Sequence, residues 1–230
     1  QLTKGSIKLA QQNFGEHFHA IRALAERFQP DVIFPLMDLS VEANAFGCYT
    51  LFPVNQAATV VEEDFDISRL KKWRSVNMSF DTRLLGYVET QKLMNIGLER
   101  NTRRGAYVSG PYTLAAMLMG SDNAAMATVL DPDTLHRLCS FATEKIQEYT
   151  RLLISAGADI ICVLEPSAVM LGPEAFKNFS ADYIRHIRRS VEYTGVDIIY
   201  HTCGNTMHLI DCMVESGVHG ISLDGAEVGV

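Results

Sequence analysis

The sequence lacks three features that would place it in other classes of protein. No apolar run reaches the roughly 18 residues of a membrane-spanning helix, so we expect no membrane span. A basic excess is missing too: 27 acidic and 20 basic residues give a net charge of −7, which disfavours nucleic acid as the main partner. No glycine-rich phosphate loop follows a strand-like run, which disfavours a nucleotide-binding sheet.

Cysteines are few and scattered. Five cysteines among 230 residues, an odd count, do not indicate a disulfide framework. We therefore expect reduced thiols and a cytoplasmic protein. Two of the cysteines, Cys139 and Cys162, lie in apolar surroundings and are predicted to be small core residues.

Five short and nearly continuous apolar runs are present. Such runs are typical of strands that are buried on both faces of a parallel sheet. Helical patterns precede or separate them, and this alternation predicts an α/β fold with right-handed crossovers. The runs are residues 31–38, 105–111, 158–166, 196–204 and 218–225.

Helix boundaries are indicated by capping residues. A helical pattern over 7–28 leads into the first run. The helix before the third run is expected to take Asp133 as its N-cap and to stop at Gly157. The next helix is expected to have Pro173 in its first turn and to stop at Gly195.

Polar residues stand at the C-terminal end of every run. In a (β/α)8 barrel, that is where the chemistry is carried, so we predict a barrel of the TIM type rather than a doubly wound sheet. Five strands are visible, and closure needs about three more. The rim residues are Asp38, Ser109, Glu165, His201 with Cys203, and Asp224.

We interpret residues 1–230 as one barrel domain, truncated at both ends. The chain begins at Gln1 and stops without a closing element, so we expect it to be part of a longer protein. Residues 48–103 show no long regular period. We predict that they form an elaborated region over the barrel mouth, with one helix over 82–100.

The pair His201 and Cys203 is the sharpest chemical signal. Strand side chains alternate with a period of two, so both point the same way, and zinc readily takes Cys and His ligands. The alternative is a locally bonded histidine beside a core cysteine. Asp224 ends the next run and is the candidate third ligand, or else a helix cap. Glu165 flanks the pair from the preceding run.

Two other groups are weaker candidates. His208 and Cys212 are spaced i, i+4 on a helical pattern, where a packed face is favoured over a metal site. His17 and His19 are two apart in a helical pattern, so they do not share a face.

Several segments resemble one known family, the uroporphyrinogen decarboxylase superfamily. Within it, the sequence is similar to the zinc-dependent cobalamin methyltransferase branch, which includes methylcobamide:coenzyme M methyltransferases. True decarboxylases carry a tyrosine where this sequence has Met117, and they lack the His-x-Cys pair. The segments are "FPLMDLSVEANAFG" (34–47), "GPYTLAAMLMG" (110–120), "EPSAVMLGPEAFKNF" (165–179), "YHTCGN" (200–205) and "ISLDGAEVGV" (221–230).

The resemblance implies a zinc site and an activity. His201 and Cys203 would be ligands, with a cysteine beyond Val230 completing the set and Asp224 in the fourth position until a thiol displaces it. The reaction would move a methyl group from a methyl-corrinoid, carried by a corrinoid protein, to a zinc-activated thiol such as coenzyme M, or to tetrahydrofolate.

The resemblance also implies roles for other residues and leaves alternatives open. Asp38 and Glu165 would be catalytic, and Tyr112 and Met117 would contact the corrinoid. One alternative is a metal-free tetrapyrrole decarboxylase in which Asp38 steadies the pyrrole N–H groups. The other is a non-catalytic homologue that binds a corrinoid protein.

Overall fold

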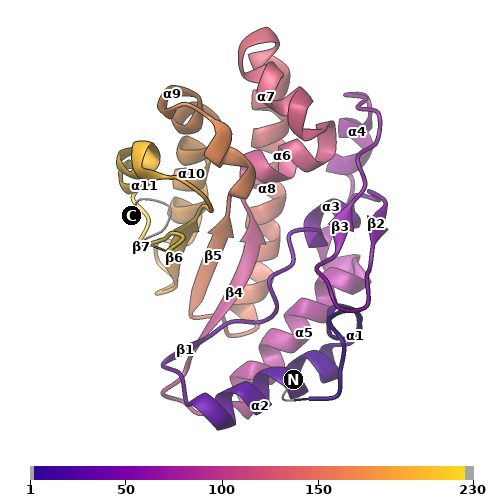
Figure 1. Cartoon of the computed structure of the whole chain (residues 1–230), viewed down its shortest axis with the longest axis vertical. Helices are drawn as coiled ribbons and strands as arrows, with labels where there is room; N and C mark the ends of the chain where they lie inside the picture. The colour runs from indigo at the N-terminus through magenta and orange to yellow at the C-terminus, as the bar shows by residue number, and fades with distance from the viewer. Residues whose placement is uncertain (1–2, 226–230) are drawn as a thin grey trace.

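A curled, five-stranded parallel sheet forms the centre of the molecule (Figure 1). The computed structural model describes residues 3–225. Neighbouring strands follow the order β1-β4-β5-β6-β7 and are parallel throughout, so their C-terminal ends lie along one edge. The five predicted runs are confirmed as strands, which form half of a barrel within the described part of the chain. They are β1 (Val32–Ile33), β4 (Arg103–Ser109), β5 (Ile160–Leu164), β6 (Asp197–His201) and β7 (Gly220–Ser222).

Helices connect and cover the strands. None in residues 3–225 is long and apolar enough to cross a membrane. The α-helices are α1 (Ile7–Gln12), α2 (Phe14–Phe28), α3 (Val41–Ala45), α4 (Arg69–Arg74), α5 (Thr82–Gly97), α6 (Pro111–Met119), α7 (Ser121–Leu130), α8 (Pro132–Ser155), α9 (Pro173–Phe176), α10 (Asp182–Ser190) and α11 (Ile210–Glu215). Shorter turns are η1 (Met78–Phe80), η2 (Pro166–Met170), η4 (Met207–Leu209) and the π-helical η3 (Lys177–Ala181).

Two helix starts differ from the sequence-based prediction. The pattern over 7–28 is two helices, because Asn13 is extended and its side chain accepts a hydrogen bond from the N–H of Glu16, which starts α2 anew. Asp133 as the N-cap of α8 is wrong. The cap is Asp131, whose carboxylate accepts from the N–H of Thr134 at 3.2 Å, while Pro132 takes the first helical position.

Gly157 ends α8 where it was predicted to, whereas the helix stop predicted at Gly195 is wrong. Gly157 follows α8 with φ of 101°. The helix α10 already ends at Ser190, and Gly195, with φ of 74°, follows the turn after it. These are left-handed conformations that glycine adopts without the steric penalty of a Cβ. Pro173 opens α9, as expected.

The core lies between the sheet and the helices α6, α8 and α10. Every residue of β5 is buried, which explains its continuous apolar sequence. Tyr149 on α8 and Tyr200 on β6 are among the largest fully buried side chains. Cys139 and Cys162 are buried as predicted, and all five cysteines are free.

Residues 48–103 contain a small hairpin and two helices. β2 (Thr50–Leu51) pairs antiparallel with β3 (Thr59–Val60), and α4 and α5 follow. The helix predicted over 82–100 is confirmed as α5, which packs against α2. Figure 1 shows the hairpin and α4 on the side of the molecule away from β6 and β7. That this region covers a barrel mouth stays a prediction.

Glu42 joins α3 to the end of β4 inside the core. Its Oε1 accepts from the N–H of Ser109 at 2.7 Å, and its Oε2 lies 3.0 Å from the Ser109 hydroxyl. That hydroxyl is also 3.1 Å from the carbonyl of Leu39, so a protonated Glu42 can donate to Ser109 while Ser109 donates to Leu39. Complete burial raises the pKa of Glu42 to about 7.

This burial predicts that the contribution of Glu42 to folding stability falls as pH rises from about 4.5 to 7. Glu42 binds its proton more tightly in the folded than in the unfolded chain, so stability is lost as pH rises towards the folded pKa. The full effect is about 3 kcal/mol. In urea unfolding across this pH range, the stability of wild type relative to Glu42→Gln should fall as pH rises. Identical slopes would contradict the prediction.

Candidate metal site

His201 and Cys203 stand together at the C-terminal end of β6. His201 pairs in register with Leu164 of β5 and Ser222 of β7, so it lies in the middle of the rim formed by these strands. Thr202 between them is fully buried on the other side. The Nε2 of His201 lies 3.2 Å from the Sγ of Cys203. Both side chains therefore reach one point, as the strand period predicts.

Contacts with Ser222 determine which ring nitrogen of His201 is available. Its Nδ1 lies 3.1 Å from the Ser222 carbonyl and 3.0 Å from the Ser222 hydroxyl. A carbonyl only accepts, so we assign the proton to Nδ1 and a free lone pair to Nε2. A backbone partner of this kind is what usually orients a metal-binding histidine. Without a metal, the thiol of Cys203 donates to this lone pair.

Asp224 completes a group of three potential ligands. One carboxylate oxygen, Oδ2, accepts from the N–H of Gly204 at 2.7 Å and so holds the turn that follows Cys203. Ligand atoms of His201, Cys203 and Asp224 all lie within 4.8 Å of one another. Nitrogen, sulfur and oxygen at this spacing fit a zinc ion with small side-chain movements. Burial, and secondly the charge of Asp224, raise the pKa of the Cys203 thiol.

The other histidine and cysteine candidates do not join this group. Cys212 on α11 donates to the carbonyl of Pro173 at 3.6 Å. His17 is buried and His19 is exposed, so the two point apart as predicted. Across residues 3–225, the set at β6 and β7 is the single group of three or more ligating side chains close enough for one ion. The predicted cysteine beyond Val230 lies outside the described residues.

Glu165 lies fully buried at the end of β5, where it binds the start of α6. Its Oε1 accepts from the N–H of Tyr112 at 3.1 Å and from the hydroxyl of Ser180 at 2.8 Å. Its Oε2 accepts from the N–H of Thr113 at 2.8 Å. Ser180 in turn lies 2.6 Å from the hydroxyl of Tyr200, the neighbour of His201. Burial raises the pKa of Glu165, although these donors oppose the shift.

Asp38 is equally enclosed, at the edge of the sheet beyond β1. Its Oδ2 accepts from Gln11 at 2.9 Å, from Tyr87 at 2.7 Å and from the guanidinium of Arg83. Its Oδ1 accepts from the N–H and the hydroxyl of Ser40. Five hydrogen-bond donors on five separate groups thus surround this one carboxylate. Any substrate that binds Asp38 must replace some of them.

Tyr112 and Met117 are core-facing residues of α6. Tyr112 is 2% exposed, and burial raises the pKa of its hydroxyl to about 12. Met117 is partly buried and packs against the same core cluster. Their predicted contact with a corrinoid stays a prediction.

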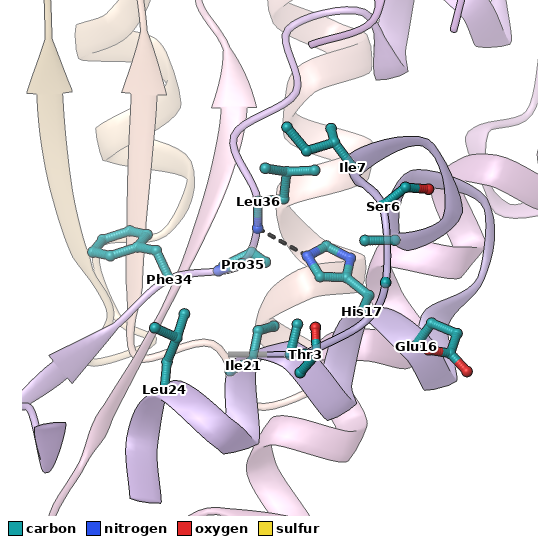
Figure 2. Close-up of a pocket in the computed structure, with 13 residues that line it drawn as sticks. Thr3, Ser6, Ile7, Glu16, His17, Ile21, Leu24, Phe34, Pro35 and Leu36 are labelled. Carbon is teal, nitrogen blue, oxygen red and sulfur yellow. Dashed lines mark hydrogen bonds between the residues drawn. The ribbon is translucent and has the colours of Figure 1, made fainter. Parts of the chain in front are cut away.

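Sequence reasoning missed the cavities beside the N-terminal helices. One, of about 480 Å³, lies between α2, the preceding segment and residues 34–36, and its walls are mainly apolar (Figure 2). The Nε2 of His17 accepts from the N–H of Leu36 at 2.8 Å in its wall. Burial lowers the pKa of His17 to about 4, so this imidazole is neutral at pH 7. The helical periodicity of the sequence did not indicate that the His17 side chain points inward and contacts a loop residue 19 positions further along the chain.

Comparison with known families gives one match over most of the chain. The profile of the uroporphyrinogen decarboxylase (URO-D) family matches residues 17–227. A methyltransferase structure from Methanosarcina mazei superposes with a TM-score of 0.86 at 20% identity, covering 98% of this chain and 66% of that one. At this identity the superposition establishes the barrel-type fold alone.

Curated relatives fall into two groups with similar identity. Methylcobamide:CoM methyltransferase MtbA from Methanosarcina mazei is 25% identical over 195 residues, which is 81% of this chain and 56% of that protein. A uroporphyrinogen decarboxylase from Prochlorococcus marinus (strain MIT 9312) is 22% identical over 205 residues, 86% of this chain and 58% of that protein. The chain thus spans somewhat more than half the length of these relatives.

The close fit around Glu165 predicts that Gly110 cannot be enlarged. A Cβ on Gly110 would lie 2.1 Å from Cγ and Cδ of Glu165, whereas a Cβ on Gly172 meets nothing within 4 Å. Both glycines are N-caps that precede a proline, so Gly172→Ala is a matched control. Gly110→Ala should cost about 2 kcal/mol or more in urea unfolding. Equal stability of the two variants would contradict this packing.

Proposed function

The chain belongs to the uroporphyrinogen decarboxylase family, and from this membership we propose that it serves methyl transfer from a methyl-corrinoid to a thiol. The observation that supports this activity is the group formed by His201, Cys203 and Asp224. It stands at the strand ends, where barrel enzymes carry their chemistry. The relative MtbA is named methylcobamide:CoM methyltransferase, and this name is consistent with a corrinoid methyl donor and a small thiol acceptor.

The three side chains are suited to hold zinc. Nε2 of His201 offers a lone pair because Nδ1 is committed to Ser222, and Cys203 offers sulfur on the same side of the strand. Asp224 has one oxygen on Gly204 and the other left to bind. When bound, zinc would supply a Lewis acid that favours the deprotonated form of an acceptor thiol at neutral pH.

The surrounding residues keep this arrangement rigid. The Ser222 contacts fix the ring of His201, and the Asp224 bond to the Gly204 N–H fixes the turn that carries Cys203. Asp224 follows β7, whereas His201 and Cys203 belong to β6 and the turn after it, so Asp224 can yield to an incoming thiol without moving β6. We propose that a corrinoid protein is the partner that delivers the methyl group, and that coenzyme M or tetrahydrofolate accepts it.

Zinc binding by this group is tested by a chelator competition. Wild type should bind about one zinc per chain, and Cys203→Ala should weaken binding by at least ~100-fold because a thiolate ligand is lost. Cys212→Ala is the control, since Cys212 is a free, partly buried cysteine outside the group and should bind like wild type. Equal binding by all three proteins, or by none, would refute the metal site.

The second candidate function is a tetrapyrrole decarboxylase. It is favoured by Asp38, a buried carboxylate in the segment that follows β1 and one suited to N–H donors, and by relatives named uroporphyrinogen decarboxylase. A zinc-free protein that decarboxylates uroporphyrinogen, and does not consume methylcobalamin with a thiol, would establish this function instead. A third possibility, a homologue that binds a corrinoid protein without turnover, predicts neither activity.

Asp38 and Glu165 remain proposed catalytic residues, and Tyr112 and Met117 proposed corrinoid contacts. For Asp38, the test is the neutral variant Asp38→Asn. Loss of a charge that acts on the reacting groups should lower kcat by at least ~100-fold. The variant should keep its zinc, because Asp38 is at the opposite end of the strand order from β6 and β7. A near-normal kcat would remove Asp38 from the catalytic machinery.

A further inference from the structure

Lys145 on α8 is a buried cation that takes no part in the proposed zinc chemistry. Its side chain is 7% exposed. The ammonium Nζ donates to the carbonyl of Val76 at 2.7 Å and to Oε1 of Glu148 at 2.9 Å. These bonds hold the segment after α4 against α8. An ammonium has three N–H donors, so one is left over among the contacts of the described residues.

A pocket of about 400 Å³ lies at this junction. Four of its lining residues, Lys145, Glu148, Arg151 and Leu152, are three or four positions apart on α8 and so share one face of that helix. The others belong to the segment 74–79, which runs from the end of α4 into η1. Two separate parts of the chain therefore form the pocket, and its volume suits a small molecule.

Positive charge converges on this pocket. Arg74 and Arg151 line it together with Lys145, and within residues 3–225 neither guanidinium has a hydrogen bond or an ion pair. Glu148, the one acidic residue among the described lining residues, is already bonded to Lys145. Three cations and one anion give the pocket a charge of about +2, in a chain whose net charge is −7. Such cations repel one another, so an anion bound between them is stabilised.

The uncharged walls narrow the choice of anion. The Oδ1 of Asn77 accepts from the N–H of Ser79 at 2.9 Å, which leaves the amide NH₂ of Asn77 and the hydroxyl of Ser79 as donors. Val76 and Leu152 are partly buried apolar residues of the same pocket. A phosphate monoester carries nearly two negative charges at neutral pH, accepts hydrogen bonds from arginine, and has an organic group for the apolar wall.

We propose that this pocket is a binding site for a small phosphate monoester. Arg74 and Arg151 bind the phosphate group, and Lys145 adds its charge from the wall. The organic group lies against Val76 and Leu152. All the lining residues belong to α4, η1, α8 and the segment between the first two, and none stands at a strand end. The site therefore does not depend on zinc or on the proposed methyl transfer.

Isothermal titration calorimetry on the whole chain, at about pH 7.5 with a chelator present, compares three probes. Phenyl phosphate is a dianion at this pH, phenyl sulfate is a monoanion of similar shape, and inorganic phosphate lacks the apolar group. Phenyl phosphate should bind saturably at one site per chain, at least about tenfold more tightly than phenyl sulfate. Inorganic phosphate should also bind more weakly, because it cannot contact Val76 and Leu152.

Two variants, Arg74→Gln and Arg151→Gln, test where phenyl phosphate binds. Both arginines are exposed, so the variants should fold. Each should lose at least about tenfold in affinity, because a charged donor to the phosphate is removed. Arg137→Gln is the matched control. Arg137 is also exposed on α8 but does not line the pocket, so its loss should leave the affinity unchanged.

The proposal would be overturned by wild type that shows no saturable binding of phenyl phosphate, or that binds phenyl sulfate or inorganic phosphate equally well. Variants Arg74→Gln and Arg151→Gln that bind like wild type would overturn it too, as would an equal loss in Arg137→Gln. The chelator removes zinc from all these measurements. Failure of this site therefore leaves the proposed function untouched, and failure of the zinc site leaves this proposal untouched.

Discussion

The buried carboxylate of Glu165 is the interaction on which the rim of the sheet depends. The side chain extends from the end of β5. It accepts hydrogen bonds from two N–H groups at the start of α6 and from the hydroxyl of Ser180. Its own backbone N–H donates to the carbonyl of His201 at 2.8 Å. One residue thus joins β5, β6, α6 and η3. A negative charge at a helix N-terminus is favourable, and here it also replaces the water that burial removed.

This connection has a direct consequence for the candidate metal site. Tyr200 points away from His201 and packs on Phe176 with its ring centroid 5.7 Å away, while its hydroxyl contacts Ser180. The far side of β6 is therefore fixed by packing and by the Glu165 network. His201 and Cys203 on the near side inherit that rigidity. Preorganisation of this kind is what allows a metal ligand to be held in place before the metal binds.

Carboxylates at the rim differ in burial and in how completely they are hydrogen-bonded: Asp38, Glu42 and Glu165 are buried, whereas Asp224 is not. Asp38 and Glu165 are each surrounded by donors, and Glu42 is bonded to Ser109 with its pKa raised to about 7 by burial. Asp224 uses one oxygen for Gly204. The first three hold elements together, whereas Asp224 retains capacity for a ligand. Relatives named as methyltransferases and as decarboxylases both match this chain, so membership of the family does not by itself decide between the two activities.

The amino-acid sequence by itself determined the strand positions and the shared direction of His201 and Cys203. Both follow from local periodicity: continuous apolar runs for buried strands, and alternation within one strand. It did not reveal that Asn13 divides the first helical pattern or that Asp131 is the N-cap of α8, because more than one residue near each boundary is suited to cap a helix. It also did not reveal the partners of Glu165, the inward turn of His17 or the contact of Arg83 with Asp38. Those depend on groups that are distant along the chain, such as Asp38 and Arg83, 45 residues apart, and only tertiary packing brings them together.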